Sequence, residues 1–148
     1  MESKLTSAGR KEPVAIIHIV RFKLKSGADP TKVQEAIAQL HKMGREIDSV
    51  RSYCVGKDVG GDYNMSASFS FDDMAGYAEY LHSPIHRKVD EIGLPLLDDM
   101  ISFDITSDDD PGIADRITEM HRVRYAGDEE LVKLVGSLKS YTGSGFER

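Results

Sequence analysis

The sequence has no tryptophan and only one cysteine, Cys54, among its 148 residues. A single cysteine excludes an intrachain disulfide framework and any Cys-x-x-Cys pair for metal binding or redox chemistry. The sequence also lacks an apolar run of about 18 residues, which a transmembrane helix requires. Its first residues, MESKLTSAGRKEP, lack the apolar centre of a secretory signal peptide, so we expect a cytoplasmic protein.

The sequence also has fewer basic than acidic residues. Lys and Arg number 19 against 25 Asp and Glu, which gives a formal net charge of −6. A protein that coats nucleic acid needs a basic surface to displace counterions, so we expect no nucleic-acid partner, and the missing apolar runs predict no membrane partner. The composition, 40% hydrophobic and 30% charged, is typical of one globular domain of ordinary size.

The first predicted strand, Val14–Leu24, is apolar on both faces over its first half. Residues 1–13 before it are polar and aperiodic, and we expect them to form a mobile arm. One face of the strand carries Val14, Ile16, His18, Val20, Phe22 and Leu24, and the other carries Ala15, Ile17, Ile19, Arg21 and Lys23. A strand with two apolar faces needs a partner on each side.

The rest of the segment 14–106 predicts the order β-α-β-β-α-β. We expect a helix from Asp29-Pro30 to about Gly44, strands over 49–58 and 63–71, a helix capped by Asp72, a short helix opened by Ser83-Pro84, and a strand over 100–106. These helices can cover only one face of a four-stranded antiparallel sheet. We therefore predict an α+β unit that hides its other face in a homodimer, packed sheet on sheet.

The segment 107–148 is predicted to be a C-terminal extension that is partly helical. Residues 107–112 read as a linker, and Ile113, Ile117 and Met120 recur at helical spacing. Asp128 is a candidate cap for a further helix with the apolar stripe Leu131, Leu134, Val135 and Leu138. Because such a stripe is unfavourable in water, we expect it to dock on its own domain or across the dimer. The last residues, YTGSGFER, are expected to fray.

Four blocks of the sequence together resemble the stress-responsive α/β-barrel (Dabb) family. They are IIHIVRFKL, VGKD before a glycine-containing loop, SFDDMAGYAEYLHSPIHRKV, and ISFDIT. The resemblance extends over roughly Val14–Thr106 and leaves both ends of the chain outside it. It implies a ferredoxin-like β-α-β-β-α-β unit that pairs into a dimeric α/β barrel.

Within the family, the chain is most similar to polyketide cyclases of the olivetolic acid cyclase type, which close a ring by intramolecular aldol condensation without a cofactor. The resemblance implies catalytic roles for His18, Tyr80 and His86. One detail departs from the pattern, because the cyclases have histidine directly before proline and this chain reads His82-Ser83-Pro84.

The residues themselves leave alternatives open. His18 lies among apolar neighbours and is either a base or a hydrogen-bonded core residue. Tyr80 lies at the edge of an apolar helix stripe, where it can bury its ring and point its hydroxyl into a gap. His86 would be the third residue of a helix, whose N-terminus disfavours imidazolium; it is therefore either a neutral base or part of the cap.

Other candidate sites are weaker. His82 and His86 have the spacing of a metal pair, but Ser83-Pro84 interrupts the helix that would align them, so we expect no metal. The family resemblance implies that no cofactor is needed. The stretch 56–61 lacks the ending of a phosphate-binding loop, and it more simply turns a hairpin. Cys54 has no neighbour that would activate it, and we expect a small core residue.

The favoured function is a cofactor-independent enzyme (a cyclase, isomerase or lyase) that acts on a hydrophobic, oxygenated small molecule such as a polyketide or diketone. One alternative is a non-catalytic dimer that binds a small ligand or serves in a stress response. A second is a cofactor-free monooxygenase. An enzyme should have an apolar cavity on which His18, Tyr80 and His86 converge, whereas packing histidines should leave that volume filled.

Overall fold

The computed structural model describes residues 15–146, so Val14 and the predicted arm at 1–13 lie outside the described residues. The secondary structure elements are, in chain order, β1 (Ile16–Leu24), α1 (Pro30–Glu46), β2 (Ser52–Lys57), β3 (Met65–Phe71), α2 (Met74–Leu81), α3 (Pro84–Gly93), the short 3₁₀ helix η1 (Leu94–Leu96), β4 (Leu97–Thr106), α4 (Ile113–Ala126), α5 (Glu129–Gly136) and β5 (Ser140–Thr142). Through β4 this is the predicted order, with strand limits that differ by a few residues.

Three of the helices begin at the side-chain caps that the sequence predicts. Asp29 accepts a hydrogen bond from the backbone N–H of Thr31 at 2.9 Å, and Ser83 accepts one from Ile85 at 3.1 Å. Asp128 accepts one from Leu131 at 3.0 Å and begins α5.

One predicted helix cap is wrong. The cap of α2 is Asp73, which accepts from the N–H of Gly76 at 2.8 Å, whereas Asp72 pairs with Arg51 at 2.9 Å. Helix α1 continues past Gly44 to Glu46. Gly44 serves close packing, because a Cβ at this position would lie 2.2 Å from the ring of Tyr53 on β2.

The sheet has five strands in the order β2-β3-β1-β4-β5, where the sequence predicts four antiparallel strands. Strand β1 is antiparallel to β3 and β4, and β5 adds parallel to β4. The end of the chain, predicted to fray, thus forms a strand over Ser140–Thr142. Tyr141 anchors this strand, since its ring packs edge-on against Phe146 and its hydroxyl lies 3.2 Å from that of Tyr125.

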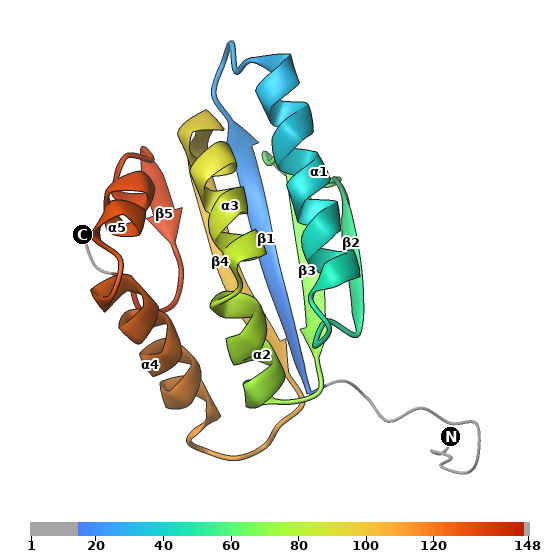
Figure 1. Ribbon diagram of the computed structural model, residues 1–148, viewed down its shortest axis with the longest axis vertical. Helices are drawn as coiled ribbons and strands as arrows, with labels where there is room; N and C mark the ends of the chain where they lie inside the picture. Colours follow the sequence, from blue (N-terminus) through green and yellow to red (C-terminus); the bar gives the residue numbers. More distant parts are fainter. Residues whose placement is uncertain (1–14, 147–148) are drawn as a thin grey trace.

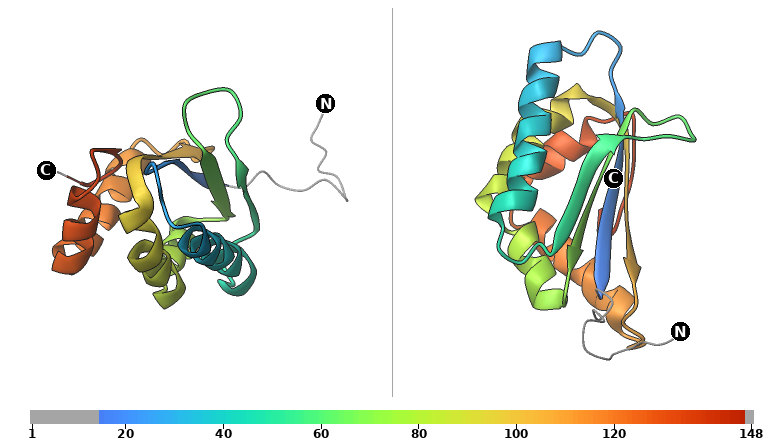
Figure 2. Two further views of the ribbon diagram at one scale, coloured as in Figure 1. Left: turned by 90° about the horizontal axis from the view of Figure 1, so that it is seen from above. Right: turned by 90° about the vertical axis from the view of Figure 1, so that its right-hand side faces the viewer.

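All helices lie on one face of the sheet, and the opposite face carries no helix among the described residues (Figures 1 and 2). Strand β1 alternates as predicted, with Ile16, His18 and Val20 buried under the helices. On the opposite face, Phe103 and Ile105 of β4 are 39% and 54% exposed. The uncovered face is therefore apolar in its centre.

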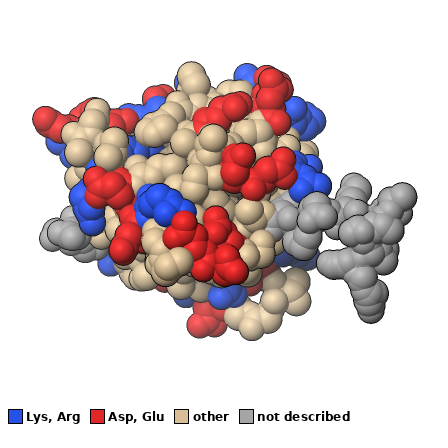
Figure 3. Space-filling view, turned by 90° about the horizontal axis from the view of Figure 1, so that it is seen from below, with Lys and Arg blue, Asp and Glu red and all other residues tan. Residues whose placement is uncertain are grey.

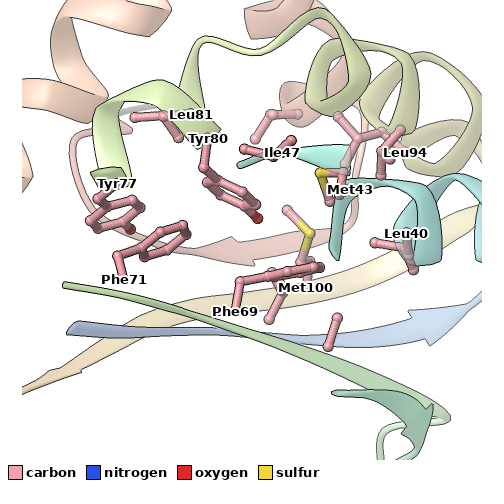
Figure 4. Packing of buried hydrophobic residues seen from close by; sticks show 14 of the residues in the cluster. Leu40, Met43, Ile47, Phe69, Phe71, Tyr77, Tyr80, Leu81, Leu94 and Met100 are labelled. Atoms are coloured by element: carbon pink, nitrogen blue, oxygen red, sulfur yellow. The ribbon is translucent and has the colours of Figure 1, made fainter. Parts of the chain in front are cut away.

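The core lies between the sheet and its helices. Phe71 stacks on Tyr77 with ring centroids 5.1 Å apart, and Tyr80 reaches from α2 toward the sheet (Figure 4). The predicted apolar stripe of the extension docks on its own domain, where Leu131, Val135 and Leu138 are buried in the same core. Helices α4 and α5 consequently belong to the helical layer.

Cys54 is exposed, which corrects its predicted place in the core. Its neighbours in β2, Tyr53 and Val55, are partly buried against the core, so alternation along the strand turns Cys54 to the opposite face.

The charge of the surface agrees with the acidic composition. On the end of the molecule shown in Figure 3, acidic side chains are prominent, and the basic side chains visible there lie among them without forming a continuous patch. No helix within residues 15–146 is long and apolar enough to cross a bilayer.

Candidate active site

The three residues predicted to form the site come from three elements and line one cavity. His18 lies on β1, Tyr80 on α2 and His86 on α3, and the cavity between the sheet and the helices has a volume of about 90 Å³. Helix α1 contributes only apolar side chains to the lining, namely Val33, Ala36, Ile37, Leu40 and Met43. Polar groups gather on the side of α2, α3 and α4.

His18 is held by a carboxylate on the neighbouring strand. In the antiparallel register of β1 and β4, His18 lies opposite Asp104, and Nδ1 of the imidazole is 2.9 Å from Oδ1 of the carboxylate. Both side chains are buried, with 5% and 8% exposure. An ionised carboxylate can only accept, so Nδ1 carries the proton and Nε2 is the free ring nitrogen.

Tyr77 of α2 joins this pair. Its hydroxyl lies 2.8 Å from Nδ1 of His18 and 2.8 Å from Oδ1 of Asp104. It also lies 2.9 Å from Nε2 of His121, a buried histidine on α4. Four titratable side chains from four elements thus form one hydrogen-bonded cluster.

Three of the four side chains in this cluster have a defined protonation state at neutral pH. Burial would raise the pKa of Asp104, but the hydrogen bonds from His18 and Tyr77 outweigh it and hold that pKa below its usual value. Burial and the charge of Asp104 raise the pKa of Tyr77 far above its usual range. Burial and the nearby His18 lower the pKa of His121 to about 4. At neutral pH, Asp104 is a carboxylate, Tyr77 a phenol and His121 a neutral imidazole.

His86 is the third residue of α3, as predicted, and it is neutral. Nδ1 lies 3.2 Å from the carbonyl oxygen of Leu81, which cannot donate, so Nδ1 carries the proton and Nε2 keeps its lone pair. Burial, then the positive charge of Arg124, holds the pKa of His86 well below its ordinary value. Burial is the main cause, where the sequence pointed to the helix N-terminus.

Tyr80 lies between the two histidines. Its ring stacks on His86 with centroids 4.6 Å apart and meets His18 edge-on at 5.7 Å. Figure 4 shows the hydroxyl pointing into the space beside Met100. Within residues 15–146 this hydroxyl has no hydrogen-bond partner, and burial raises the pKa of Tyr80, so it remains a donor.

A buried ion pair closes the cavity behind His86. Nη2 of Arg124 on α4 lies 2.5 Å from Oδ2 of Asp90 on α3, and the two side chains are 11% and 13% exposed. Oδ2 of Asp90 is 4.0 Å from Nε2 of His86. Burial raises the pKa of Asp90, against the opposing effect of Arg124. Arg124 thereby places a cation near His86 without contacting it through a hydrogen bond.

Sequence reasoning assigned no part in the site to Tyr77, Asp90, Asp104, His121 or Arg124. Asp104 carried a signal, because it alternates with Met100 and Ser102 on the buried face of β4. His121 carried one too, since it continues the spacing of Ile113 and Ile117. Asp90 and Arg124 had no such signal.

Metal binding finds no support in the described part of the chain. Residues 15–146 contain no cluster of three or more His, Cys, Asp or Glu side chains that could hold a metal ion. His82, one half of the predicted weak pair, is exposed at the end of α2, whereas His86 is buried in α3.

Comparison with known proteins identifies the fold family. A dimeric ferredoxin-like protein of unknown function from Thermobifida fusca is 26% identical, with a TM-score of 0.57 over 72% of this chain and 99% of that chain. Hydroxynitrile lyase from Passiflora edulis is 15% identical, with a TM-score of 0.58 over 67% of this chain and 98% of that chain. SnoaB, a cofactor-independent oxygenase from Streptomyces nogalater, is 10% identical, with a TM-score of 0.52 over 67% and 98%.

At 15% and 10% identity, the likeness to the lyase and to the oxygenase shows the fold alone. No curated protein matches the sequence. The sequence profile of the stress-responsive A/B barrel domain, Dabb, matches residues 16–107, which is more than half of the chain. The protein therefore belongs to the Dabb family and has its ferredoxin-like α+β fold.

Proposed function

We propose that this protein is a cofactor-independent cyclase, isomerase or lyase that acts on a hydrophobic, oxygenated small molecule by acid–base catalysis. The observation that carries the proposal is the convergence of His18, Tyr80 and His86 on one largely apolar cavity. In a protein that used these residues only for packing, the volume between them would be filled. The neutral imidazole of His86, with a defined tautomer, beside the unpaired phenol of Tyr80 is suited to moving protons.

The chemistry we propose begins at a C–H bond next to a carbonyl group. Nε2 of His86 removes the proton, and the electron pair of the broken bond moves to the carbonyl oxygen, forming an enolate. Tyr80 donates a hydrogen bond to that oxygen, and His18 donates a second one when it carries a proton on Nε2 that the Asp104 carboxylate balances. The enolate carbon then attacks a second carbonyl in a cyclase, is reprotonated at another position in an isomerase, or expels a leaving group in a lyase.

The charges around the cavity favour a neutral substrate. Asp90 balances Arg124, and the lowered pKa values of His86 and His121 keep both rings uncharged. Asp104 adds a negative charge, which a proton on His18 could at most balance. A permanently anionic ligand would therefore gain no net attraction, whereas a carbonyl oxygen that becomes negative only during the reaction can use the nearby donors.

The size of the cavity favours a compact substrate, or a larger one around which the lining side chains rearrange. Its volume of about 90 Å³ is smaller than the roughly 150 Å³ of an apolar cavity that accepts benzene. Met43 and Met100 both line it, and methionine side chains adapt readily because they are long and unbranched. The apolar part of the ligand would lie against α1, and its oxygen atoms would face the histidines.

Among the relatives of the same fold, the oxygenase is described as cofactor-independent. The names of two of them, a hydroxynitrile lyase and a cofactor-independent oxygenase, describe enzymes. The lyase name supports the lyase form of the proposal. The oxygenase name keeps the monooxygenase as a second candidate, which oxygen consumption in the presence of a bound phenol would reveal.

We also propose that two copies pack sheet on sheet into a dimeric α/β barrel. The support is the uncovered sheet face, where Ile17 pairs with Ile105 and Ile19 with Phe103, and the Thermobifida fusca relative, described as dimeric. Light scattering should give twice the 16.4 kDa of one chain. A charge at the centre of this face, Ile17→Lys, should yield monomers.

The test of the enzymatic proposal is exchange of α-protons in D₂O. A panel of neutral methyl ketones, 1,3-diketones and hydroxynitriles is incubated with the protein and followed by proton NMR. We expect catalysed exchange or turnover of at least one compound, lost in His86→Gln. Binding without any exchange, turnover or oxygen consumption would favour the non-catalytic ligand-binding dimer.

A further inference from the structure

A buried ion pair joins the C-terminal extension to the helix that carries His86. Arg124 lies on α4, beyond residue 107 where the Dabb profile ends, and Asp90 lies on α3, one turn after His86. Nη2 of Arg124 is 2.5 Å from Oδ2 of Asp90, and the two side chains are 11% and 13% exposed. Both line the cavity, so the extension places a cation in its wall.

The carboxylate oxygen that Arg124 holds also faces His86. Oδ2 of Asp90 is 4.0 Å from Nε2 of His86, which is too far for a hydrogen bond. Because Nδ1 of His86 carries the ring proton toward the carbonyl oxygen of Leu81, Nε2 keeps its lone pair. A carboxylate this close to an imidazole ordinarily favours the protonated ring. The neutral state of His86 therefore needs an explanation.

The other histidine of the cavity has a carboxylate that no cation holds. Asp104 accepts from Nδ1 of His18 at 2.9 Å and from the Tyr77 hydroxyl at 2.8 Å. No Lys or Arg side chain within residues 15–146 pairs with Asp104, so this carboxylate is free to bind the imidazole. At Asp90, the guanidinium of Arg124 takes the position that a protonated imidazole would otherwise occupy.

Resting on the function proposed above, we propose that Arg124 is a positioning residue: it holds Asp90 as an ion pair, prevents this carboxylate from binding a proton together with His86, and so keeps the Nε2 lone pair open to the substrate. Without the cation, Asp90 and His86 would take up one proton from solvent and share it between Oδ2 and Nε2. Whichever atom carried the proton, the lone pair of Nε2 would be in use. The availability of the base in this chain then depends on a helix beyond the family domain.

The remaining charges around the pair leave Arg124 in the deciding position. Arg87 also faces Asp90, but Asp128 already holds its guanidinium at 2.7 Å. The charged and titratable groups that face His86 or Asp90 are His18 of β1, Tyr80 of α2, Arg87 of α3, His121 and Arg124 of α4, and Asp128 at the start of α5. The direction of the pKa of His86 agrees, because burial and then Arg124 lower it.

Two variants of the full-length chain separate the charge from the packing. Arg124→Met removes the cation and leaves Asp90, whereas a double variant, Asp90→Leu with Arg124→Met, replaces the whole pair by apolar side chains, a change that proteins often tolerate. Nitrogen-15 NMR reports the state of Nε2 with no substrate present, and the spectrum of His86→Gln assigns the signal. At neutral pH we expect a free lone pair in the wild type and in the double variant, and a protonated or hydrogen-bonded Nε2 in Arg124→Met.

The pH dependence of catalysed α-proton exchange supplies the second readout. A charge close to a titratable group shifts its pKa by about 1–3 units, so the acidic limb of the rate profile should move up by about 1–3 pH units in Arg124→Met and return in the double variant. A free lone pair in Arg124→Met, or an equal change of Nε2 in both variants, would overturn the proposal. Should Arg124→Met not fold, Arg124→Gln takes its place, since its amide can donate to Asp90 but carries no charge.

The two readouts distinguish this proposal from the proposed function. If Nε2 of His86 responds to residue 124 as expected but no ketone reacts, the enzymatic proposal fails and the role of Arg124 toward Asp90 and His86 stands. If ketones react and Nε2 is the same with and without Arg124, the reverse holds.

Discussion

His18 and His86 face one cavity but are held in opposite ways. A carboxylate, Asp104, accepts from His18, whereas a neutral backbone carbonyl, that of Leu81, accepts from His86. A proton added to His18 would be balanced by Asp104, whereas a proton added to Nε2 of His86 would lie 4.0 Å from Asp90, a carboxylate that already pairs with Arg124. In the proposed mechanism, this difference suits His86 to brief acceptance of a proton.

The largest effect is expected when the imidazole of His86, the proposed base, is removed. His86→Gln should lower turnover by about 10²- to 10⁴-fold, the usual contribution of a general base, with little loss of stability. Turnover in a ketone exchange assay and the urea midpoint would be measured side by side.

His18→Ala is the matched comparison. It removes the partner of Asp104 and leaves a hole among buried neighbours, so it should lower both turnover and stability. Both histidine variants could instead lose stability to a similar extent and keep ligand binding per folded molecule. In that case the two histidines have a structural role and take no part in catalysis.

Tyr80→Phe tests the group that lies between the two histidines. The substitution removes only a hydroxyl without a partner, so stability should change little. Loss of a donor to a developing oxyanion should lower kcat by about 10²-fold. An unchanged kcat would remove Tyr80 from the mechanism and leave it as the ring that stacks on His86.

Asp104→Asn sharpens the contrast by making the support of His18 neutral, like that of His86. We expect a loss of turnover smaller than that of His86→Gln, and a loss of stability of about 1–3 kcal/mol at neutral pH. Because the pKa of Asp104 is lowered by folding, its stabilising contribution exists above the unfolded value of about 4 and vanishes as the pH falls through the folded one. Urea denaturation of both proteins should therefore converge in acid.

The smallest effect is the pH dependence due to His86. Folding lowers the pKa of His86 well below 6.5, so below that pH the unfolded chain binds more protons and stability falls as the pH falls. For one such group the slope is about 1.4 kcal/mol per pH unit. His86→Gln should flatten the fall between pH 6.5 and pH 5, measured by urea unfolding. A slope equal to that of the wild type would mean that another group titrates.

The parts of the site that could be predicted depend on local signals. Alternation along β1 placed His18 on the inner face, and Ser83-Pro84 fixed His86 as the third residue of its helix. Asp104 meets His18 only through the register between β1 and β4, which are far apart in the sequence. His121 depends in the same way on where α4 docks.

The wrong limits of the fold have the same origin. Asp72 and Asp73 are equally good caps locally; in the fold Asp73 accepts from the N–H of Gly76, and Asp72 pairs with Arg51 instead. Strand β5 is three residues long and pairs with a distant strand, so no periodicity could reveal it. Exposure of Cys54 follows from which face of β2 meets the core.

The short strand β5 has a further consequence for shortened forms of the chain. It occupies the hydrogen-bonding positions opposite Asp99–Ile101 at the border of the sheet. A chain cut before Ser140 would leave those backbone groups unpaired, and an unpaired strand edge is a template for other chains. Such a protein should tend to aggregate through strand addition. Strand β5 therefore protects this edge of the sheet from pairing with strands of other molecules.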